Sequence, residues 1–185
     1  MQTNLNSTDN SSTEKLSNPL WEAAFRHYQN QEFQEAYQLY KKDFESTGDH
    51  KSLHNMAWMR REMGFYEEAL EIIETERQLL QILSPDSQDT KLSICVNLYE
   101  LSYLNLLLEK PEVAKNYFQE YENLDFESGD VCERACFYRL KGDLLKQEEP
   151  SNAQQAYQMA SKCFEDLGDL EGIREIRDRL AELNA

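Results

Sequence analysis

Apolar residues recur at every third or fourth position through most of this chain. The pattern is clearest around Gly64, which ends one apolar series just before Tyr66, Ala69 and Ile73 begin another. Such spacing gathers the apolar side chains on one face of an α-helix, and a glycine between two series indicates a tight turn. The sequence therefore predicts helices that are joined by short turns.

The same periodicity divides the chain into consecutive expected helices. They span Asn18–Asn30, Phe33 to Gly48, Lys51–Met63, Phe65–Leu83, Thr90–Glu109, Pro111 to Tyr121, Asp130 to Gly142, a segment around Ala156–Phe164 that follows a turn at Glu149–Asn152, and Asp169–Leu183. Pro19 and Pro111 stand near helix starts, where the missing N–H is not needed. We expect the side chain of Asp49 to cap the third helix.

Two of these units repeat one another at a constant shift along the chain. The shift that carries Phe33–Ala36 onto Tyr66–Ala69 also carries Ala24, in the preceding helix, onto Ala57. Small residues at these positions let the two helices of a pair approach closely, and neighbouring Tyr or Phe rings fill the space beside them. Because a helical pair cannot bury its apolar face alone, we expect the pairs to stack.

Two further units are less regular. The step from Ala69 to Ala114 is longer than the step from Ala36 to Ala69, so the third unit carries an insertion, part of it in the loop at 84–87. In the fourth unit Gly142 takes the role of the small residue ahead of Ala156. The final segment has one apolar and one charged face, as a helix that closes a stack requires. Its apolar positions are Leu170, Ile173, Ile176, Leu180 and Leu183.

A helix–turn–helix unit with a period near 34 is the signature of the tetratricopeptide repeat (TPR). The chain resembles this family from about Asn18 to its last residue, on the alanine and aromatic positions named above. The resemblance implies an all-α fold, a right-handed α-solenoid of about four TPR-like helix pairs plus a C-terminal capping helix. Its expected parts are a disordered polar tail at 1–17 and a helical domain at 18–185, with units at about 18–48, 49–83, 89–125 and 130–168 and the capping helix at 169–183.

Composition narrows the classes of partner. The net charge is −16, and carboxylates cluster from Glu120 to Glu133. This field repels phosphate backbones, so we expect no nucleic-acid partner. Two interpretations of the charge stay open, namely solubility and a preference for neutral or basic partners over acidic ones. No apolar run approaches the roughly 20 residues that span a bilayer, so no membrane partner is expected.

The chain is expected to work without a cofactor in a reducing compartment. Its four cysteines form no C-x-x-C pair, and its histidines are far from them in sequence, so we predict no metal site and buried or half-buried free thiols. Residues 1–17 lack a basic start and an apolar core, so they do not resemble a secretory signal. Together these features predict a cytoplasmic location.

The sequence shows no catalytic constellation. It contains no Gly-rich phosphate loop, no H-E-x-x-H, no G-x-S-x-G and no cysteine with a histidine close by in sequence. The abundant Asp and Glu residues are scattered along helix faces, as solvated positions are. We therefore expect that this chain is not an enzyme.

The resemblance also implies where a partner would bind. In the TPR family the first helix of each pair lines a concave groove, and two positions of that helix point inward. Here the matching residues are Trp21, Phe25, His54, Trp58, Tyr99, Tyr103, Arg139 and, roughly, Asp143. Most are aromatic, which suits recognition of an extended or helical peptide. An alternative stays open for Trp21, because a register error of one residue would bury it.

One known binding mode is not expected. Family members that hold the C-terminal carboxylate of heat-shock chaperones use Lys, Asn and Arg at five positions. The matching residues here are Trp21, Phe25, Asn55, Val96 and Glu100. Only Asn55 fits, and without the cations a carboxylate has no partner. We therefore predict that acidic, carboxylate-ended peptides do not bind in this way.

The leading hypothesis is a non-enzymatic protein-interaction module, an adaptor, scaffold or chaperone-like protein that binds a partner peptide or helix in an aromatic groove. One alternative is a bacterial type III secretion translocator chaperone, which is similar in size, acidity, tail and repeat count. Others are an acidic inhibitor that mimics nucleic acid with the surface at 120–133, and a regulatory sensor subunit that binds a signalling peptide. Self-association through the groove or an open end is also possible.

Overall fold

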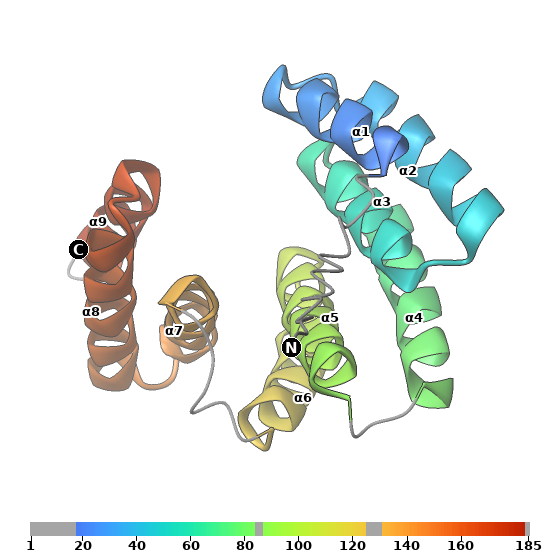
Figure 1. The fold of residues 1–185 in the computed structure, drawn as a ribbon. Coiled ribbons are helices and arrows are strands. Elements are labelled where there is room, and N and C mark those ends of the chain that lie inside the picture. The colour runs from blue at the N-terminus through green and yellow to red at the C-terminus, as the bar shows by residue number, and fades with distance from the viewer. Residues whose placement is uncertain (1–17, 84–86, 125–130, 184–185) are drawn as a thin grey trace, which may run out of the picture.

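The computed structural model describes residues 18–83, 87–124 and 131–183, which form nine α-helices and no strand. The helices are α1 (Pro19–Gln29), α2 (Phe33–Thr47), α3 (His50–Glu62), α4 (Tyr66–Ile82), α5 (Gln88–Leu107), α6 (Pro111–Glu122), α7 (Val131–Leu145), α8 (Pro150–Leu167) and α9 (Leu170–Leu183). Successive helices pair, and the pairs follow one another along an arc that α9 completes (Figure 1). The expected tail at 1–17 and the loop residues 84–86 lie outside the described residues.

Local chemistry explains where these helices begin and end. The side chains of Asn18 and Asp49 accept hydrogen bonds from the backbone N–H groups of Leu20 (3.1 Å) and Lys51 (3.0 Å), as N-caps do. Gly64 has φ of +80° in the turn before α4, a conformation that favours glycine. One expected boundary was wrong. From the sequence, residues 150–152 are expected to belong to a turn, but the helix α8 already begins at Pro150. Proline is well suited to the first position of a helix, where its missing N–H is not needed.

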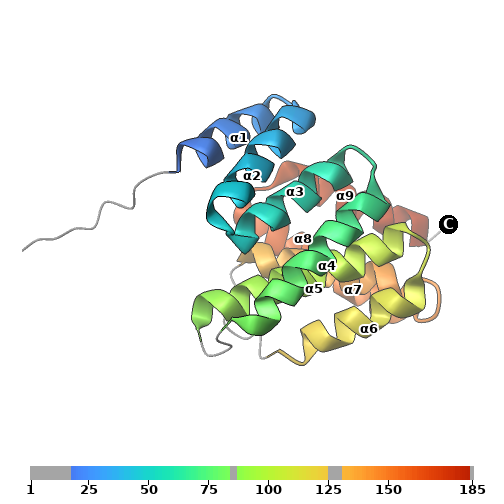
Figure 2. The same ribbon diagram turned by 90° about the vertical axis from the view of Figure 1, so that its right-hand side faces the viewer.

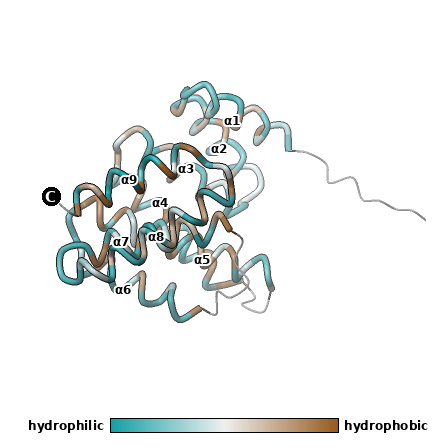
Figure 3. The backbone as a smooth tube through the Cα atoms, turned by 90° about the vertical axis from the view of Figure 1, so that its left-hand side faces the viewer, coloured by the Kyte–Doolittle hydropathy of each residue, from teal (hydrophilic) through white to brown (hydrophobic). Residues whose placement is uncertain are grey.

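The repeated small residues lie where the helices of a pair meet. Ala24, Ala36, Ala57, Ala69 and Ala114 have no exposed surface. This confirms the close approach that the sequence predicts. Figure 3 shows that hydrophobic and hydrophilic residues alternate along the helices. The third and fourth pairs use Ser102 and Gly142 at the equivalent place, and the hydroxyl of Ser102 donates to the backbone oxygen of Ala114 at 2.8 Å.

Gly142 lets α7 approach α8 closely. A Cβ atom at this position would overlap the ring of Tyr157 on α8, which is fully buried and donates its hydroxyl to Asp143 at 2.8 Å. The ring therefore has little room to move aside.

We expect Gly142→Ala to lower the free energy of unfolding by about 1–3 kcal/mol, because the added methyl group overpacks this contact. Helix propensity alone predicts a gain of roughly 0.5–1 kcal/mol for the same change. Urea unfolding followed by far-UV circular dichroism distinguishes the two effects, because they change the free energy of unfolding in opposite directions. A variant more stable than wild type would contradict the close approach of α7 and α8.

Each of the first two pairs also contains a buried carboxylate. Asp43 on α2 accepts hydrogen bonds from the side chains of Asn18 (2.7 Å), Trp21 (2.9 Å) and Ser52. It thereby joins α1, α2 and α3. Although burial alone would raise the pKa of Asp43, hydrogen bonds led by that of Ser52 hold the pKa below its ordinary value.

Glu76 on α4 repeats this arrangement in the second pair, at the shift that relates Ala36 to Ala69. Its carboxylate lies 3.2 Å from Nδ1 of His54 and 3.5 Å from Nδ1 of His50, and accepts a hydrogen bond from Asn97 of α5 at 2.9 Å.

In the third pair Tyr121 takes the equivalent place, since it follows Glu76 by the same step that separates Ala114 from Ala69. Its ring packs edge-on against Phe137, with ring centroids 5.3 Å apart. An aromatic side chain therefore stands at the joint between α6 and α7, where the first two pairs have a carboxylate.

These features confirm an all-α solenoid of helix pairs closed by a capping helix. Figure 2, turned from the first view, shows α4, α5 and α6 in front of α7, α8 and α9. The capping helix packs on α8 through Ile176, which is fully buried, and Gly172, whose missing side chain accommodates the ring of Phe164. In the ranges that the structure describes, no helix has the length and apolar character that crossing a membrane requires.

Candidate peptide-binding surface

The inner side of the arc carries two adjoining recesses, of about 370 and 560 Å³. Four charged residues line both of them, namely Arg61, Glu62, Arg139 and Glu175. Tyr66, Tyr103 and Leu107 complete the first recess. The second recess continues past Tyr28 and Trp58 to Phe164 and the polar residues of α9. We call these residues the inner surface. Most of them come from α1, α3, α5, α7 and α9, and Tyr66 of α4 and Phe164 of α8 join them.

At the centre of the inner surface, two arginines lie close to one aromatic ring. The guanidinium carbons of Arg61 and Arg139 lie 5.3 and 5.9 Å from the ring centroid of Tyr103. Arg61 donates to Glu100 at 2.5 Å, and Arg139 donates to Glu175 at 2.8 Å. Burial would lower the pKa of Arg61, but the charge of Glu100 outweighs it and raises the pKa. Both arginines therefore already have an anionic partner, and both contact the ring of Tyr103.

An aromatic edge lies at the α1 and α3 end of the inner surface. The rings of Tyr28 and Trp58 are 4.6 Å apart between centroids, and the indole N–H of Trp58 donates to Glu62 at 3.0 Å. Phe25 extends this edge, with 51 % of its surface exposed and its ring 6.1 Å from that of Tyr28. A partner that covers these rings would remove much apolar surface from water.

Four of the predicted groove residues lie on the inner surface or beside it. Trp58, Tyr103 and Arg139 line the recesses, and Phe25 lies beside them. Trp21 and His54 turn toward buried carboxylates on α2 and α4 instead.

Trp21 also packs edge-on against Tyr40 at 5.6 Å, so the structure favours the interior position that the sequence left open. Tyr99 is 8 % exposed and accepts a hydrogen bond from Arg139 at 2.5 Å, and burial raises the pKa of its hydroxyl. Asn55 is half-buried on α3 and lines neither recess. Asp143 is buried, where it accepts from Tyr157 at 2.8 Å and from Arg179 at 2.9 Å. The binding role of these residues stays a prediction.

Sequence reasoning missed Tyr28, Arg61 and Glu62. A signal for the first two exists, because the shift that relates the first two units carries Tyr28 onto Arg61, and each follows an inward aromatic residue, Phe25 or Trp58, by three positions. One helical turn places them on the same face as that residue. Glu62 has no such signal, because its role comes from its contact with Trp58.

Two other sequence features look different in the structure. In the acidic segment 120–133, Glu120 pairs with Arg77, and Glu122 pairs with Lys141 at 2.7 Å, so these carboxylates are partly neutralised. Residues 125–130 of that segment lie outside the described part of the chain. Among the cysteines, Cys132 is exposed, contrary to the expectation of buried or half-buried thiols, because it lies in the first turn of α7.

Comparisons with known proteins identify the fold. No protein-family model matches the sequence, and no curated protein matches it. Among solved structures the chain is similar to BtubC from P. vanneervenii, with 14 % identity, a TM-score of 0.60, and 89 % of this chain and 78 % of that one covered. It is also similar to the TPR-like repeats of a kinesin light chain from Podospora anserina, with 15 % identity, a TM-score of 0.55 and coverages of 90 % and 93 %. The TPR2AB domain of yeast Sti1, solved as a complex with pHSP90, gives 16 % identity, a TM-score of 0.50 and coverages of 89 % and 76 %.

Proposed function

Because the chain has the fold of the tetratricopeptide-repeat solenoids, we propose that it is a non-enzymatic protein-interaction module whose inner surface binds a segment of a partner protein. The observation that carries this proposal is the row of half-buried aromatic side chains, Tyr28, Trp58 and Tyr103, along two adjoining recesses. Aromatic rings held by their neighbours bury large areas with little loss of freedom, which is typical of binding hot spots. The Sti1 structure supports the general mode, since that solenoid was solved with a protein partner.

The charges of the inner surface favour a neutral or basic segment. Arg61 and Arg139 already form ion pairs. At the edge of the larger recess Glu171, Asp178 and Arg174 have no ion pair within the described chain, so two negative charges stand there against one positive charge. An acidic segment would meet these carboxylates without gaining a free arginine at the centre. This argument also supports the prediction that carboxylate-ended acidic peptides do not bind here, since Arg61 already donates to Glu100.

We expect the double variant Trp58→Ala with Tyr103→Ala to weaken partner binding by roughly 10- to 100-fold, since two hot-spot rings are truncated. Partners are first captured with the wild-type chain from lysate of the source cells and identified by mass spectrometry. The affinity of the bound segment is then measured by fluorescence anisotropy.

The matched control is Phe65→Ala, which removes a ring that is 46 % exposed but lines neither recess. Far-UV circular dichroism checks that each variant is folded. Unchanged affinity in a folded double variant would rule out the inner surface. Binding that collapses between low and high salt would instead point to an acidic surface.

A further inference from the structure

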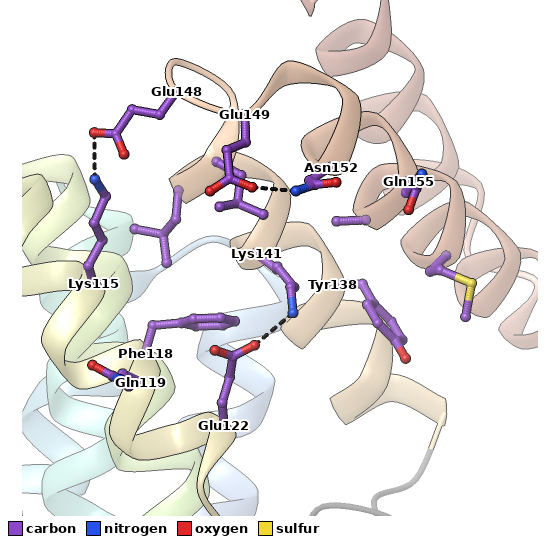
Figure 4. A pocket seen from close by; sticks show the side chains of 14 residues that line it. Lys115, Phe118, Gln119, Glu122, Tyr138, Lys141, Glu148, Glu149, Asn152 and Gln155 are labelled. Atoms are coloured by element: carbon purple, nitrogen blue, oxygen red, sulfur yellow. Dashed lines mark hydrogen bonds and ion pairs between the residues drawn. The ribbon is translucent and has the colours of Figure 1, made fainter.

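A second groove lies on the other side of α7, between α6 and α8. It measures about 660 Å³ and is separate from the inner surface, because α7 presents Arg139 to the inner recesses but Tyr138 and Lys141 to this groove. It lies at the joint between α6 and α7, where Tyr121 takes the place of the buried carboxylate. There the rings of Phe118 on α6 and Phe137 on α7 stack, with centroids 5.1 Å apart. We call this space the outer groove (Figure 4).

The floor of the outer groove is apolar. Phe118, Leu144 and Ala156 are buried beneath it, and Met159 of α8 lines it with 46 % of its surface exposed. Covering the exposed surface of Met159 would be favourable, by about 25 cal/mol for each Å² of apolar surface removed from water. Methionine also adapts its shape readily, which suits a surface that accepts another side chain.

The rim of the outer groove carries more negative than positive charge. Its two lysines are both paired, Lys115 with Glu148 at 2.7 Å and Lys141 with Glu122 at 2.7 Å. Glu149 contacts only the side-chain amide of Asn152 within the described chain, so its carboxylate has no cationic partner (Figure 4). The rim therefore has one carboxylate ready to pair, in a chain whose net charge is −16.

We propose that the outer groove binds an amphipathic helix of a partner protein. Side chains of α6, α7 and α8 all line the groove, so an added helix can pack against all three. The apolar floor requires a stripe of large apolar side chains on that helix, one of which covers Met159. The unpaired carboxylate of Glu149 requires a lysine or arginine beside the stripe, which also fits the charge of the whole chain.

The probe is a phage-displayed library of single helices with randomised surface positions, selected on the folded, full-length chain. Clones are then tested against Met159→Glu, which places a charge on the floor, and Glu149→Lys, which reverses the charge on the rim. We expect clones with an apolar stripe and an adjacent lysine or arginine, whose affinity falls about tenfold or more with Met159→Glu and several-fold with Glu149→Lys.

Two control variants localise the effect. Val113→Glu changes an apolar residue of similar exposure, 42 %, that lies on α6 outside the groove, and Trp58→Ala changes the inner surface. Neither should alter the affinity of these clones more than twofold. The proposal is overturned if no clone distinguishes wild type from a folded Met159→Glu chain, or if the clones that do carry an acidic face instead of a basic one.

Discussion

Replacing Asp43 with alanine is expected to lower the free energy of unfolding by about 3 kcal/mol, because it leaves buried donors without an acceptor and opens a cavity. The donors are the side chains of Asn18, Trp21 and Ser52, which belong to the start of α1, to α1 itself and to α3. The loss should therefore loosen the first pair and its contact with the second. Urea unfolding followed by circular dichroism and tryptophan fluorescence measures the change.

Two variants sharpen the test of Asp43. Glu45→Ala removes an exposed carboxylate close by on α2 and should change stability by less than about 0.5 kcal/mol. Asp43→Asn keeps one oxygen acceptor and the size of the side chain, so its loss should be smaller than that of alanine. If Asp43→Ala were no more destabilising than Glu45→Ala, the network around Asp43 would not hold the first pair together.

Replacing Glu76 with alanine is expected to cost a similar amount, about 3 kcal/mol, and also to change how stability depends on pH. Burial alone would lower the pKa of His54, but the hydrogen bond and charge of Glu76 outweigh it and raise the pKa above its ordinary value. Burial alone would raise the pKa of Glu76, but hydrogen bonds from His50, His54 and Asn97 hold it lower. Each group therefore stabilises the charged form of the other.

The signs of the two shifts define the pH window. The raised pKa of His54 contributes stability that is complete below its unfolded value near 6.5 and is lost as pH rises through the folded pKa. The lowered pKa of Glu76 contributes stability that is complete above its unfolded value near 4.5 and is lost as pH falls through the folded pKa. This cluster should thus stabilise the fold most between these two values.

The comparison of wild type with Glu76→Gln isolates the cluster from all other titrating groups. In that variant the stabilising charge of Glu76 is gone, so the decrease in stability that His54 causes as pH rises above about 6.5 should become smaller. Glu74→Ala, an exposed change on the same helix, should keep the wild-type slope. A slope that is the same in Glu76→Gln and wild type would show that Glu76 and His54 are not coupled.

The helices and their pairing could be predicted from the sequence because they depend on local spacing. A helix repeats every 3.6 residues, so apolar periodicity, caps such as Asp49 and small residues such as Ala36 and Ala69 are readable without a structure. The orientation of a single side chain is less secure. One residue turns a helix by about 100°, which decides whether Trp21 faces a partner or the carboxylate of Asp43.

The inner surface could be predicted only in part. The repeat spacing of Phe25, Trp58 and Tyr103 predicts that they share one face. The contacts of Tyr103 with Arg61 and Arg139 join three helices, and the sequence does not show how close those helices lie. The role of Glu62 likewise arises from contact.

The sequence by itself therefore determined an all-α chain of repeated helix pairs with a closing helix, because backbone hydrogen bonds and apolar periodicity act within a few residues. Only the tertiary structure decided which acids are buried, how the arginines are paired and where the outer groove opens. These features depend on the angle between successive pairs. Different contacts between helices form at each joint, such as Asp43 with Ser52 at one and Phe118 with Phe137 at another. The physical reason is that packing between helices depends on the shape and charge of side chains from different helices, which the local sequence pattern does not bring together.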